Sequence, residues 1–568
     1  MHRFSGDISI VLGGAAGQGV QTVETLLMQI LHKEGYFVFA SKEYMSRIRG
    51  GSNSTEIRLT NKKRQAFVDR IDLLFALDKD VVPHLAHRLT KKTVIIGEKS
   101  KVCETECSVV DIPFTKFANE LGHPIYTSTV AVGVVLGMLQ ADEAVFHDYL
   151  KTHFARKGEA VVAKNIEAAK KGYAHGRHIA FVEGIELTVS RKKENERELL
   201  MEGIDAIGLG TLAAGCNYIS SYPMSPGTGL LTFLAREGRE FGVVVDQAED
   251  EIAAINQGLG AWYAGARAVV TTSGGGFALM TEGVSLSGII ETPIVVHIGM
   301  RPGPATGLPT RTEQADLNLA LYAGHGEFPR AIFAPGSLEE SYQVMQQAFE
   351  VADRFQVPVM VLTDQYLLDS VSIVAQDGLK TLPITQYVVE TKSDYERYAL
   401  AQDGISSRGI PGYGTGLVGV DSDEHDTEAH ITESHIVRLE QHGKRLKKLD
   451  GLREIALPPV VIGNLKQAKT LIVTWGSNYG VVAEVLDRLE NKKLAQIHFP
   501  QVYPLPSVGK KLFAKTKNIL VIENNAAGQF ANLLEQEYGV TVDERILKYD
   551  GNPFSVEEVT QKLKAIRS

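Results

Sequence analysis

The sequence predicts an α/β protein built from three α/β domains. Short apolar runs alternate with helical patterns along most of the 568 residues, and this order is typical of parallel sheets covered by helices. At about 150 residues per domain, the length alone indicates three or four domains. Hydrophobic residues make up 44% of the chain and charged residues 22%, which excludes a mostly disordered protein.

Residues 1–185 are predicted to form the first α/β domain. An apolar run at 8–12 precedes a glycine-rich turn at 13–19 and a helical pattern at about 20–32, which is the order of a β-α-β unit. Further strands are expected at 36–40, 73–77, 93–96 and 108–112, and helical patterns fill about 143–172.

Residues 195–375 are predicted to form the second domain, a doubly wound parallel sheet. Six short apolar runs are separated by helical patterns, and strands buried on both faces have this continuous apolar character. The expected strands are 218–221, 243–246, 268–272, 294–298, 330–334 and 357–363.

Residues 376–455 differ from both neighbours in composition. They are polar and rich in Asp, Glu and His, which predicts an extended linker or interface excursion with irregular backbone, packed on other parts of the protein. Residues 456–568 return to β/α alternation and are predicted to form the third α/β domain. Its expected strands are 470–474, 496–499 and 519–523, and its expected helices are 481–490 and 530–538.

The charge and the cysteine content argue against several classes of protein. The net charge is −9, which argues against a general nucleic-acid-binding protein. Three cysteines, Cys103, Cys107 and Cys216, exclude a disulfide scaffold and are too few for the four thiolates of a usual iron–sulfur cubane. No signal peptide is recognised, and the longest apolar run, 130–139, is too short to cross a bilayer. We therefore expect a cytoplasmic protein that binds no membrane.

Two loops of the first domain admit more than one interpretation. The order Gly14-x-x-Gly17-x-Gly19 departs from the G-x-G-x-x-G fingerprint, and no acidic residue ends the next strand, which disfavours NAD. A tight turn and a backbone site for an anion are both open. Arg47 and Arg49 form either a clamp for a phosphate or carboxylate or an ordinary surface loop.

The connection 222–228 places hydroxyl groups at the carboxyl edge of the predicted second sheet, where α/β proteins bind ligands. Its two prolines fix the backbone, and Ser225 and Thr228 then present their hydroxyls. Either residue could instead cap the next helix.

Three carboxylates, Glu249, Asp250 and Glu251, begin a predicted helix directly after the strand at 243–246. Carboxylates there complement the helix dipole, which explains one or two of them. One of the three could be functional, and composition does not choose which.

Two further connections could approach a ligand closely. The turn 271–277 contains three consecutive glycines, whose entropic cost a ligand or partner chain would justify. The loop 301–311 is stiffened by prolines and carries Arg301 and Arg311, and arginine binds carboxylates through two parallel hydrogen bonds. The alternative for both is a rigid connection without a ligand.

Two remaining clusters contain metal-ligand residue types. The run Asp423-Glu424-His425-Asp426 lies in the polar excursion, which favours a solvated or interface role. Cys103-x-x-x-Cys107 has no second pair, so a zinc site is disfavoured.

Together these motifs resemble the 2-oxoacid:ferredoxin oxidoreductases, in the form of a catalytic alpha subunit with a gamma domain fused at its N-terminus. The segments 13–20 and 49–51 look like the gamma domain. The segments that look like the thiamine-pyrimidine domain are 222–228, 249–251, 272–277, 301–311 and 313–317, and those that look like the transketolase-type C-terminal domain are 474–477, 523–529 and 549–554. The resemblance covers nearly the whole chain.

The resemblance implies a reaction. The family uses thiamine diphosphate to decarboxylate a 2-oxoacid, passes the electrons through an iron–sulfur cluster to ferredoxin, and transfers the acyl group to coenzyme A, all reversibly. Resemblance to the fused, two-subunit branch makes 2-oxoglutarate the expected substrate, giving succinyl-CoA and carbon dioxide. Pyruvate and branched-chain 2-oxoacids are the alternatives.

The resemblance also implies roles for particular residues. Glu251 matches the catalytic glutamate that hydrogen-bonds the aminopyrimidine of the cofactor, and Arg301 matches the arginine that holds the substrate carboxylate. Ser225 stands where the family commonly has threonine, and Thr310 matches a threonine of the substrate pocket. With Tyr222, these residues form the expected substrate site, and no metal ligand is expected in this chain.

The family places the remaining parts of the active site on a separate beta subunit. A Gly-Asp-Gly magnesium–diphosphate motif and a four-cysteine set are both absent from this sequence, so Mg²⁺ and a [4Fe-4S] cluster are expected on that beta subunit, with thiamine diphosphate shared. A dimer of alpha–beta pairs is the expected assembly. A non-catalytic assembly subunit is an alternative that Glu251 and Arg301 disfavour. An arylpyruvate-specific enzyme is another, which usually carries its own cluster cysteines.

Overall fold

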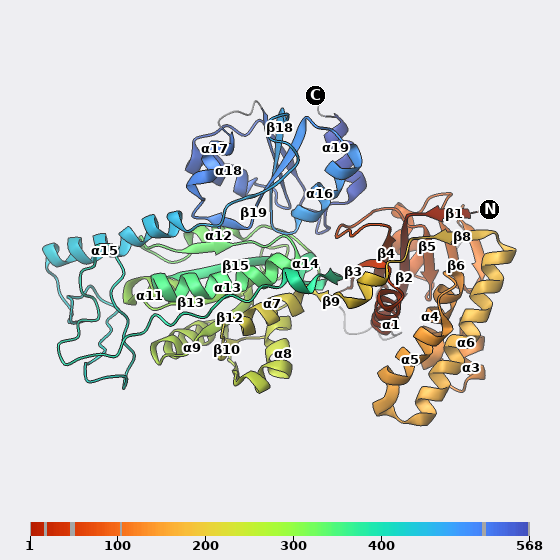
Figure 1. Ribbon diagram of the computed structural model, residues 1–568, viewed down its shortest axis with the longest axis horizontal. Helices are drawn as coiled ribbons and strands as arrows, with labels where there is room; N and C mark the ends of the chain where they lie inside the picture. The colour runs from red at the N-terminus through yellow and green to blue at the C-terminus, as the bar shows by residue number, and fades with distance from the viewer. Residues whose placement is uncertain (1, 16–19, 46–51, 103–104, 514–517, 566–568) are drawn as a thin grey trace. The chain divides into compact units, whose positions relative to one another are not determined.

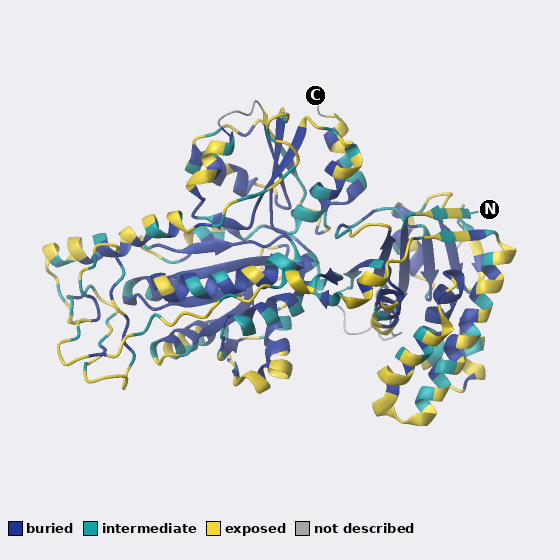
Figure 2. Ribbon diagram, in the orientation of Figure 1, coloured by how far each residue is buried: buried dark blue, intermediate teal, exposed yellow. Residues whose placement is uncertain are grey.

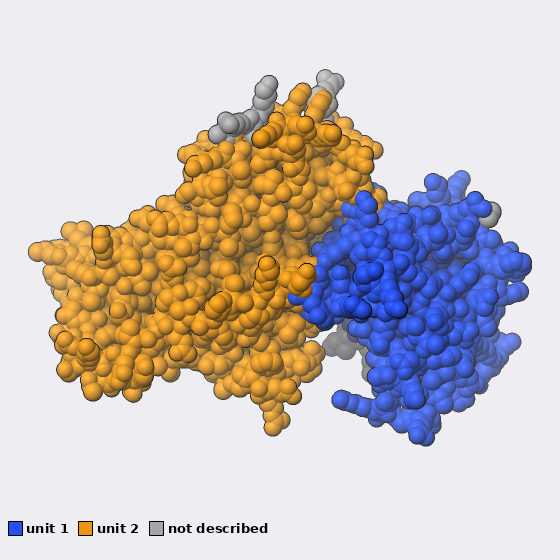
Figure 3. Space-filling model, viewed as in Figure 1, with its two compact units in different colours: residues 1–202, 369–376, 555–557 blue, residues 203–368, 377–554, 558–568 orange. Residues whose placement is uncertain are grey.

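A computed structural model describes residues 2–15, 20–45, 52–102, 105–513 and 518–565. The chain forms two compact units (Figure 3). Unit 1 comprises residues 1–202, 369–376 and 555–557, and unit 2 comprises the remaining segments 203–368, 377–554 and 558–568. The predicted Gly17–Gly19 turn, the Arg47 and Arg49 loop and Cys103 lie outside the described residues. Figure 2 shows that most strands of the large sheets are buried and that many helices are buried along one side and exposed along the other.

Unit 1 is built on an eight-stranded mixed sheet of order β7-β6-β5-β2-β4-β3-β16-β9. The strands are β2 (Asp7–Ala15), β3 (Phe37–Glu43), β4 (Ser52–Thr60), β5 (Leu73–Ala76), β6 (Val94–Gly97), β7 (Ser108–Asp111), β9 (Leu199–Glu202) and β16 (Val371–Val374). Strands β5, β6 and β7 run parallel to β2, whereas β4 pairs antiparallel with β2 and β3. The predicted turn at Gly13 and Gly14 was wrong, because both residues continue β2 and pair with Ser54 and Asn53.

The helices of unit 1 include one that the sequence analysis described only as an apolar run. They are α1 (Val20–Lys33), α2 (Val81–Leu85), α3 (Phe114–Glu120), α4 (Thr127–Met138), α5 (Glu143–Phe154) and α6 (Glu159–Val182). Helix α4 crosses α6 at glycines on both sides. A methyl group on Gly133 or Gly137 would overlap the backbone of α6, and one on Gly172 or Gly176 would overlap the backbone of α4. Part of the glycine excess therefore serves helix packing.

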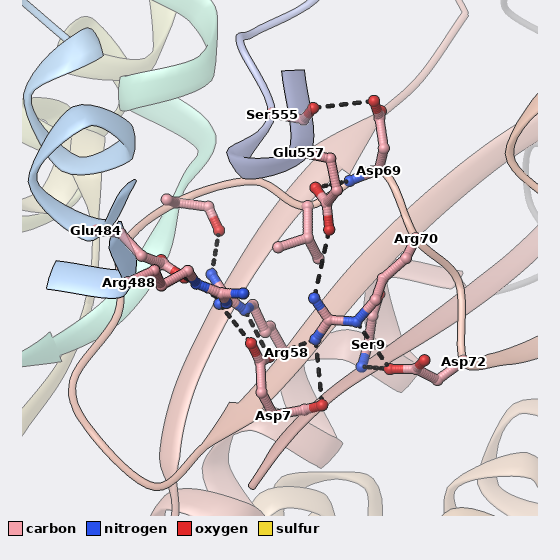
Figure 4. Close-up of polar contacts among 12 residues, drawn as sticks. Asp7, Ser9, Arg58, Asp69, Arg70, Asp72, Glu484, Arg488, Ser555 and Glu557 are labelled. Atoms are coloured by element: carbon pink, nitrogen blue, oxygen red, sulfur yellow. Dashed lines mark hydrogen bonds and ion pairs between the residues drawn. The ribbon is translucent and has the colours of Figure 1, made fainter. Parts of the chain in front are cut away.

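The chain returns to unit 1 near its end through residues 555–557 (Figure 4). Ser555 donates a hydrogen bond to Asp69, and the Glu557 carboxylate accepts from the Asp69 backbone at 2.9 Å. Arg70 lies 3.4 Å from Glu557 and also pairs with Asp7 at 2.6 Å. These contacts attach the C-terminal segment to unit 1. The small parallel pair β1 (His2–Ser5) and β8 (Ile185–Thr188) also belongs to this unit.

Unit 2 contains the doubly wound sheet that the sequence predicts, with strand order β11-β10-β12-β13-β15-β14-β20. The strands are β10 (Tyr218–Ser221), β11 (Val244–Gln247), β12 (Ala268–Ser273), β13 (Ile294–Met300), β14 (Ala331–Phe333), β15 (Pro358–Asp364) and β20 (Gln501–Tyr503). All neighbours are parallel except β14 and β20. The six predicted strands are confirmed, and β20 is an additional edge strand supplied by the C-terminal segment.

Two groups of helices pack on this sheet (Figure 1). Helix α7 (Gly203–Ala213) contacts α8 (Thr228–Glu237) and α13 (Leu338–Phe355), whereas α9 (Glu251–Tyr263) contacts α10 (Gly274–Leu279) and α11 (Thr281–Ile290). In the sheet, β11 lies on one side of β10, whereas β12 and then β13 lie on its other side. The order of the strands therefore reverses between β10 and β12, which is where open α/β sheets bind ligands.

Residues 377–434 are mostly irregular, as predicted, but the excursion ends in a 20-residue helix, α15 (His435–Glu454). Lys444 and Lys448 of α15 are buried and bind the two carboxylate oxygens of Glu291 at 2.7 and 2.6 Å. The cluster at 423–426 packs in the same region, because Glu424 pairs with Arg445 and His425 stacks on Tyr398 at 3.9 Å between ring centroids. Among the described residues, no group of three His, Cys, Asp or Glu side chains could hold a metal ion.

The C-terminal part of unit 2 is a five-stranded sheet of order β17-β19-β18-β21-β22. Its strands are β17 (Val460–Ile462), β18 (Thr470–Trp475), β19 (Leu494–Phe499), β21 (Asn518–Glu523) and β22 (Glu544–Leu547). Helix α16 (Asn478–Leu489) lies on one side, and α17 (Ser507–Phe513) and α18 (Gln529–Tyr538) lie on the other (Figure 1). The last helix is α19 (Val556–Ala565). No helix among the described residues is long and apolar enough to span a membrane.

Candidate active site

The candidate site lies at the carboxyl edge of the seven-stranded sheet, at the reversal between β10 and β12. Because β10 to β13 are parallel and adjacent, the segments that follow them reach one edge. The end of β12 touches the loop after β10, since a methyl group on Gly227 would lie 2.6 Å from the carbonyl oxygen of Thr272. The sheet thus brings together the motifs predicted from 222–228 and 271–277.

Three acidic residues at the start of α9 have three different environments. Glu249 is exposed. Asp250 caps the helix, because its side chain accepts a hydrogen bond from the backbone of Ala253 at 2.7 Å. Glu251 is 2% exposed. The dipole explanation therefore accounts for Asp250, and the structure leaves Glu251 as the buried carboxyl group.

The Glu251 carboxyl group faces the glycine-rich first turn of α10, the helix that directly follows β12. A methyl group on Gly276 would overlap both Oε1 of Glu251 and Oγ1 of Thr272. Neither of these buried oxygens has a hydrogen-bond partner among the described residues, and Oγ of Ser273 also has none. Burial raises the pKa of Glu251, and the nearby Asp250 adds to the increase. A buried acid with an unpartnered oxygen is a group that can bind or transfer a proton.

Arg301 follows the last residue of β13 and is 9% exposed. Its guanidinium donates a hydrogen bond to the backbone carbonyl of Ser225 at 2.6 Å, which joins the loops after β13 and β10. Burial lowers the pKa of Arg301, and the charge of Asp316 opposes this. The remaining guanidinium donors have no hydrogen-bond partner among the described residues, so they are available to an anion.

Ser225, Tyr222 and Thr310 lie on the two loops that Arg301 joins. Ser225 and Tyr222 are exposed, and Thr310 is half-buried. Ser225 contacts Arg301 through its carbonyl group, which leaves its hydroxyl free of that contact. Within the described residues, neither Tyr222 nor Thr310 hydrogen-bonds Arg301 or Glu251. The structure therefore shows a direct contact between Arg301 and Ser225. Tyr222 lies on the same loop as Ser225, and Thr310 lies on the same loop as Arg301.

A buried histidine links three strands next to the site through hydrogen bonds. His297 of β13 hydrogen-bonds Thr271 of β12 at 2.9 Å and Thr363 of β15 at 2.8 Å. Burial lowers the pKa of His297 to about 3, so the ring is neutral. Thr271 also donates to the carbonyl of Gly227 at 3.1 Å, which fixes the loop that carries Ser225.

Asp316 is a site residue whose role is not evident from the sequence alone. A methyl group on Gly274 would overlap its carboxylate, and its Oδ2 is buried without a hydrogen-bond partner among the described residues. Burial raises the pKa of Asp316 to about 6, against the opposing charge of Arg301. Asp316 belongs to the 313–317 motif, but only the folded chain shows which of its side chains faces the site.

Comparisons with known proteins agree with this geometry. Residues 209–444 match the family model described as pyruvate flavodoxin/ferredoxin oxidoreductase, thiamine diphosphate-binding, and residues 9–175 match pyruvate ferredoxin/flavodoxin oxidoreductase. The 2-oxoacid:ferredoxin oxidoreductase subunit alpha of Saccharolobus solfataricus is 30% identical, over 98% of both chains. The chain belongs to the 2-oxoacid:ferredoxin oxidoreductase family.

Two further relatives lie within the 2-oxoacid:ferredoxin oxidoreductases. The 2-oxoglutarate oxidoreductase subunit KorA of Mycobacterium tuberculosis is 29% identical, over 77% of this chain and 67% of the relative. The solved structure of 2-oxoglutarate:ferredoxin oxidoreductase from Magnetococcus marinus, with 2-oxoglutarate, coenzyme A and succinyl-CoA bound, superposes with a TM-score of 0.92 at 28% identity and covers 99% of each chain. The chain is thus an alpha-type subunit of a ferredoxin-dependent 2-oxoacid oxidoreductase.

The residues at the strand reversal fit thiamine diphosphate. Its aminopyrimidine carries nitrogen donors and acceptors, and the unpartnered oxygens of Glu251, Thr272 and Ser273 can complement such groups. Gly276 leaves the Glu251 carboxyl group uncovered by a side chain. The family model that matches this region is a thiamine diphosphate-binding one.

Proposed function

We propose that this chain is the alpha subunit of a 2-oxoglutarate:ferredoxin oxidoreductase that works with a separate beta subunit. The reaction is the reversible, coenzyme A-dependent oxidative decarboxylation of 2-oxoglutarate to succinyl-CoA and carbon dioxide, with the electrons passed to ferredoxin. The observation that carries the proposal is the buried Glu251 carboxyl group at the strand reversal, with an unpartnered oxygen facing the Gly276 turn.

Glu251 is proposed to hold the cofactor and control a proton. When bound, thiamine diphosphate supplies a nucleophilic thiazolium carbon. Oε1 of Glu251 would hydrogen-bond the pyrimidine ring and hold or release a proton there. Its raised pKa supports this role, because a carboxyl group tuned toward neutrality serves proton transfer better than an ordinary one.

Arg301 is proposed to bind the substrate carboxylate through its free guanidinium donors. The hydrogen bond to Ser225 fixes one side of the guanidinium, so the remaining donors are already oriented for a carboxylate. Ser225, Thr310 and Tyr222 would line the same pocket.

The choice of 2-oxoglutarate rests on relatives. The KorA protein of Mycobacterium tuberculosis and the enzyme of Magnetococcus marinus carry that substrate in their names, and both align with most of this chain. Relatives such as that of Saccharolobus solfataricus are named for 2-oxoacids in general. Pyruvate and branched-chain 2-oxoacids are therefore the competing substrates in the test.

The beta subunit is proposed because this chain lacks parts that the reaction needs. A Gly-Asp-Gly sequence is absent, and three cysteines cannot supply four thiolates. Mg²⁺, which binds the diphosphate, and the [4Fe-4S] cluster are assigned to the beta subunit, with ferredoxin as the external electron acceptor. Two alpha–beta pairs would form the complete enzyme.

The deciding experiment compares this chain alone with the chain co-purified with its beta subunit. Reduction of ferredoxin or a viologen dye is followed with coenzyme A and 2-oxoglutarate, pyruvate or a branched-chain 2-oxoacid. We expect turnover only in the complex, with the highest kcat/KM for 2-oxoglutarate. Turnover by the single chain would reject the need for a beta subunit. A complex that is inactive with all three acids would support a non-catalytic assembly role.

A further inference from the structure

The five-stranded part of unit 2 contacts the chain on both sides of Asp316. Gln529, the first residue of α18, donates a hydrogen bond to the carbonyl of Ala315 at 2.7 Å. The side-chain oxygen of the same glutamine accepts from the backbone of Asn318 at 2.8 Å. One side chain of the C-terminal sheet thus fixes the backbone immediately before and after Asp316.

Gln314 forms a second set of contacts with the same sheet. It is completely buried, and its amide group donates to the carbonyl of Trp475 at 3.0 Å and accepts from Asn478 at 2.8 Å. Its backbone exchanges two further contacts, donating to the Asn524 carbonyl at 2.7 Å and accepting from the Asn525 side chain at 3.2 Å. Buried amides that are fully paired in this way hold one conformation. We call residues 312–318 the docked segment.

The docked segment determines where the Asp316 carboxylate lies. That carboxylate sits against Gly274, and its charge acts on Arg301. Asp316 is the last residue of the 16-residue connection 301–316, which joins β13 to α12 (Leu317–Tyr322). Gln529 supplies the hydrogen bond at the Ala315 carbonyl, so the backbone beside Asp316 depends on the five-stranded part of unit 2.

We propose that Gln529 and Gln314 are positioning residues through which the five-stranded sheet sets the affinity of the Arg301 site for the 2-oxoacid carboxylate. The inference rests on the proposed function. It assigns the motifs 474–477 and 523–529 to support of the substrate site, rather than to a ligand of their own. Neither glutamine is proposed to touch substrate or cofactor.

The test uses the complete alpha–beta complex and three variants. Gln529→Ala removes both contacts to the docked segment, and Gln529→Glu keeps the acceptor for Asn318 but loses the donor to Ala315. Gln496→Ala is the matched control. Gln496 is completely buried in β19 of the five-stranded sheet, where it donates to Thr474 at 2.8 Å and Tyr479 at 3.1 Å and does not contact the docked segment.

We expect Gln529→Ala to raise the KM for the 2-oxoacid about tenfold, because an Asp316 carboxylate released from its place against Gly274 would pair with Arg301 in competition with the substrate, with the KM for thiamine diphosphate changed less than about twofold. Gln529→Glu should lie between wild type and Gln529→Ala. Hydrogen exchange of a peptide spanning 309–318 should accelerate in Gln529→Ala and stay at the wild-type rate in Gln496→Ala.

Three results would overturn the inference. The first is an unchanged 2-oxoacid KM in Gln529→Ala. The second is an equal increase in Gln496→Ala, which would indicate general loosening of the sheet. The third is a wild-type complex that uses no 2-oxoacid, which rejects the proposed function itself and is recognised because the defect is present before any substitution.

Discussion

A methyl group on Gly276 would overlap Oε1 of Glu251, so the glycine and the acid occupy complementary space. Gly276 lies in the first turn of α10, the helix after β12, and Glu251 begins α9 after β11. Two segments from different strands therefore meet at one carboxyl oxygen.

Gly276→Ala is expected to displace Glu251 and lower activity at least tenfold, because the added methyl group needs the volume that the carboxyl group occupies. Gly260→Ala is the matched control. Gly260 lies in α9 with open space around a methyl group, and alanine should stabilise the helix by about 0.5–1 kcal/mol. Activity and the KM for thiamine diphosphate are measured for both. Equal activity of the two variants would argue against this arrangement.

Glu251→Gln is expected to lower kcat by about 10²–10⁴, the range of a lost proton-transfer group, while the alpha–beta complex still assembles. Glu249→Gln, at an exposed position of the same turn, should keep wild-type activity. Steady-state rates and size-exclusion chromatography separate chemistry from assembly. Wild-type turnover by Glu251→Gln would remove the residue from the mechanism.

Glu251→Gln is also expected to change the thermal stability of the protein. Because the folded state raises the pKa of Glu251, the folded protein binds this proton more tightly than the unfolded chain does. The stabilising effect of the protonated acid is present at low pH and is lost as the pH rises through the raised pKa. Glutamine carries no charge, so the Tm of Glu251→Gln should equal or exceed that of wild type near neutral pH. A lower Tm would show that the ionised group stabilises the fold.

Arg301→Lys is expected to raise the KM for the 2-oxoacid about tenfold or more, because a hydrogen bond to a charged group contributes about 1.5–3 kcal/mol and lysine cannot form the paired arginine contact. Arg239→Lys, in the exposed turn at Gly238–Phe241, is the control. Initial rates over a range of 2-oxoacid concentrations decide the point. An unchanged KM in Arg301→Lys would assign carboxylate binding elsewhere.

Asp316 should make 2-oxoacid binding depend on pH. Burial raises its pKa to about 6, and the neighbouring Glu313, which burial and Asp316 together raise to about 7, titrates next. Above its pKa the Asp316 carboxylate is negative and competes with the substrate for Arg301, and the charge of Glu313 influences that titration, so the KM should increase as the pH rises from 5 to 8, spanning about one unit on either side of the two pKa values. Asp316→Asn should flatten the lower part of that increase. A parallel profile in the variant would exclude Asp316 as its cause.

Glu291→Gln is expected to destabilise unit 2 by about 3–5 kcal/mol, the cost of leaving a buried charge unpaired. Burial opposes ionisation of Glu291, but Lys448 and Lys444 bring its pKa down to about 2. Its contribution is therefore present above the pKa of an unfolded glutamate and is lost as the pH falls toward about 2. Thermal unfolding of Glu291→Gln, at the residue directly after α11, is compared with that of Glu282→Gln, at an exposed position within α11.

The apolar strands were predictable, and the polar ones were not. Strands such as β13 and β15 were found because buried parallel strands are largely apolar runs. Strand β4 was missed because it buries polar side chains in pairs. Arg58 binds Asp7 at 2.8 Å and Glu56 binds Arg88 at 2.5 Å, partners that are distant in sequence. Burial of Lys444 and Lys448 in α15 depends in the same way on Glu291.

The site was predictable as motifs but not as contacts. Resemblance selected Glu251 and Arg301, and the structure shows the first buried and the second joined to Ser225. The hydroxyl proposed for Ser225 differs from the contact observed, which uses its carbonyl group. No role could be assigned to Asp316 or Gln529 from the sequence. Their roles depend on contacts between segments that are more than 200 residues apart in the chain.

Strand β20 has a consequence for any shortened form of the protein. Residues 501–503 pair with β14 at the edge of the seven-stranded sheet. A chain ending at residue 455 would leave the backbone donors and acceptors of Ala331–Phe333 open to other molecules, and such exposed edges recruit further strands and aggregate. Splitting the gene there should therefore yield soluble material only when both fragments are produced in the same cell.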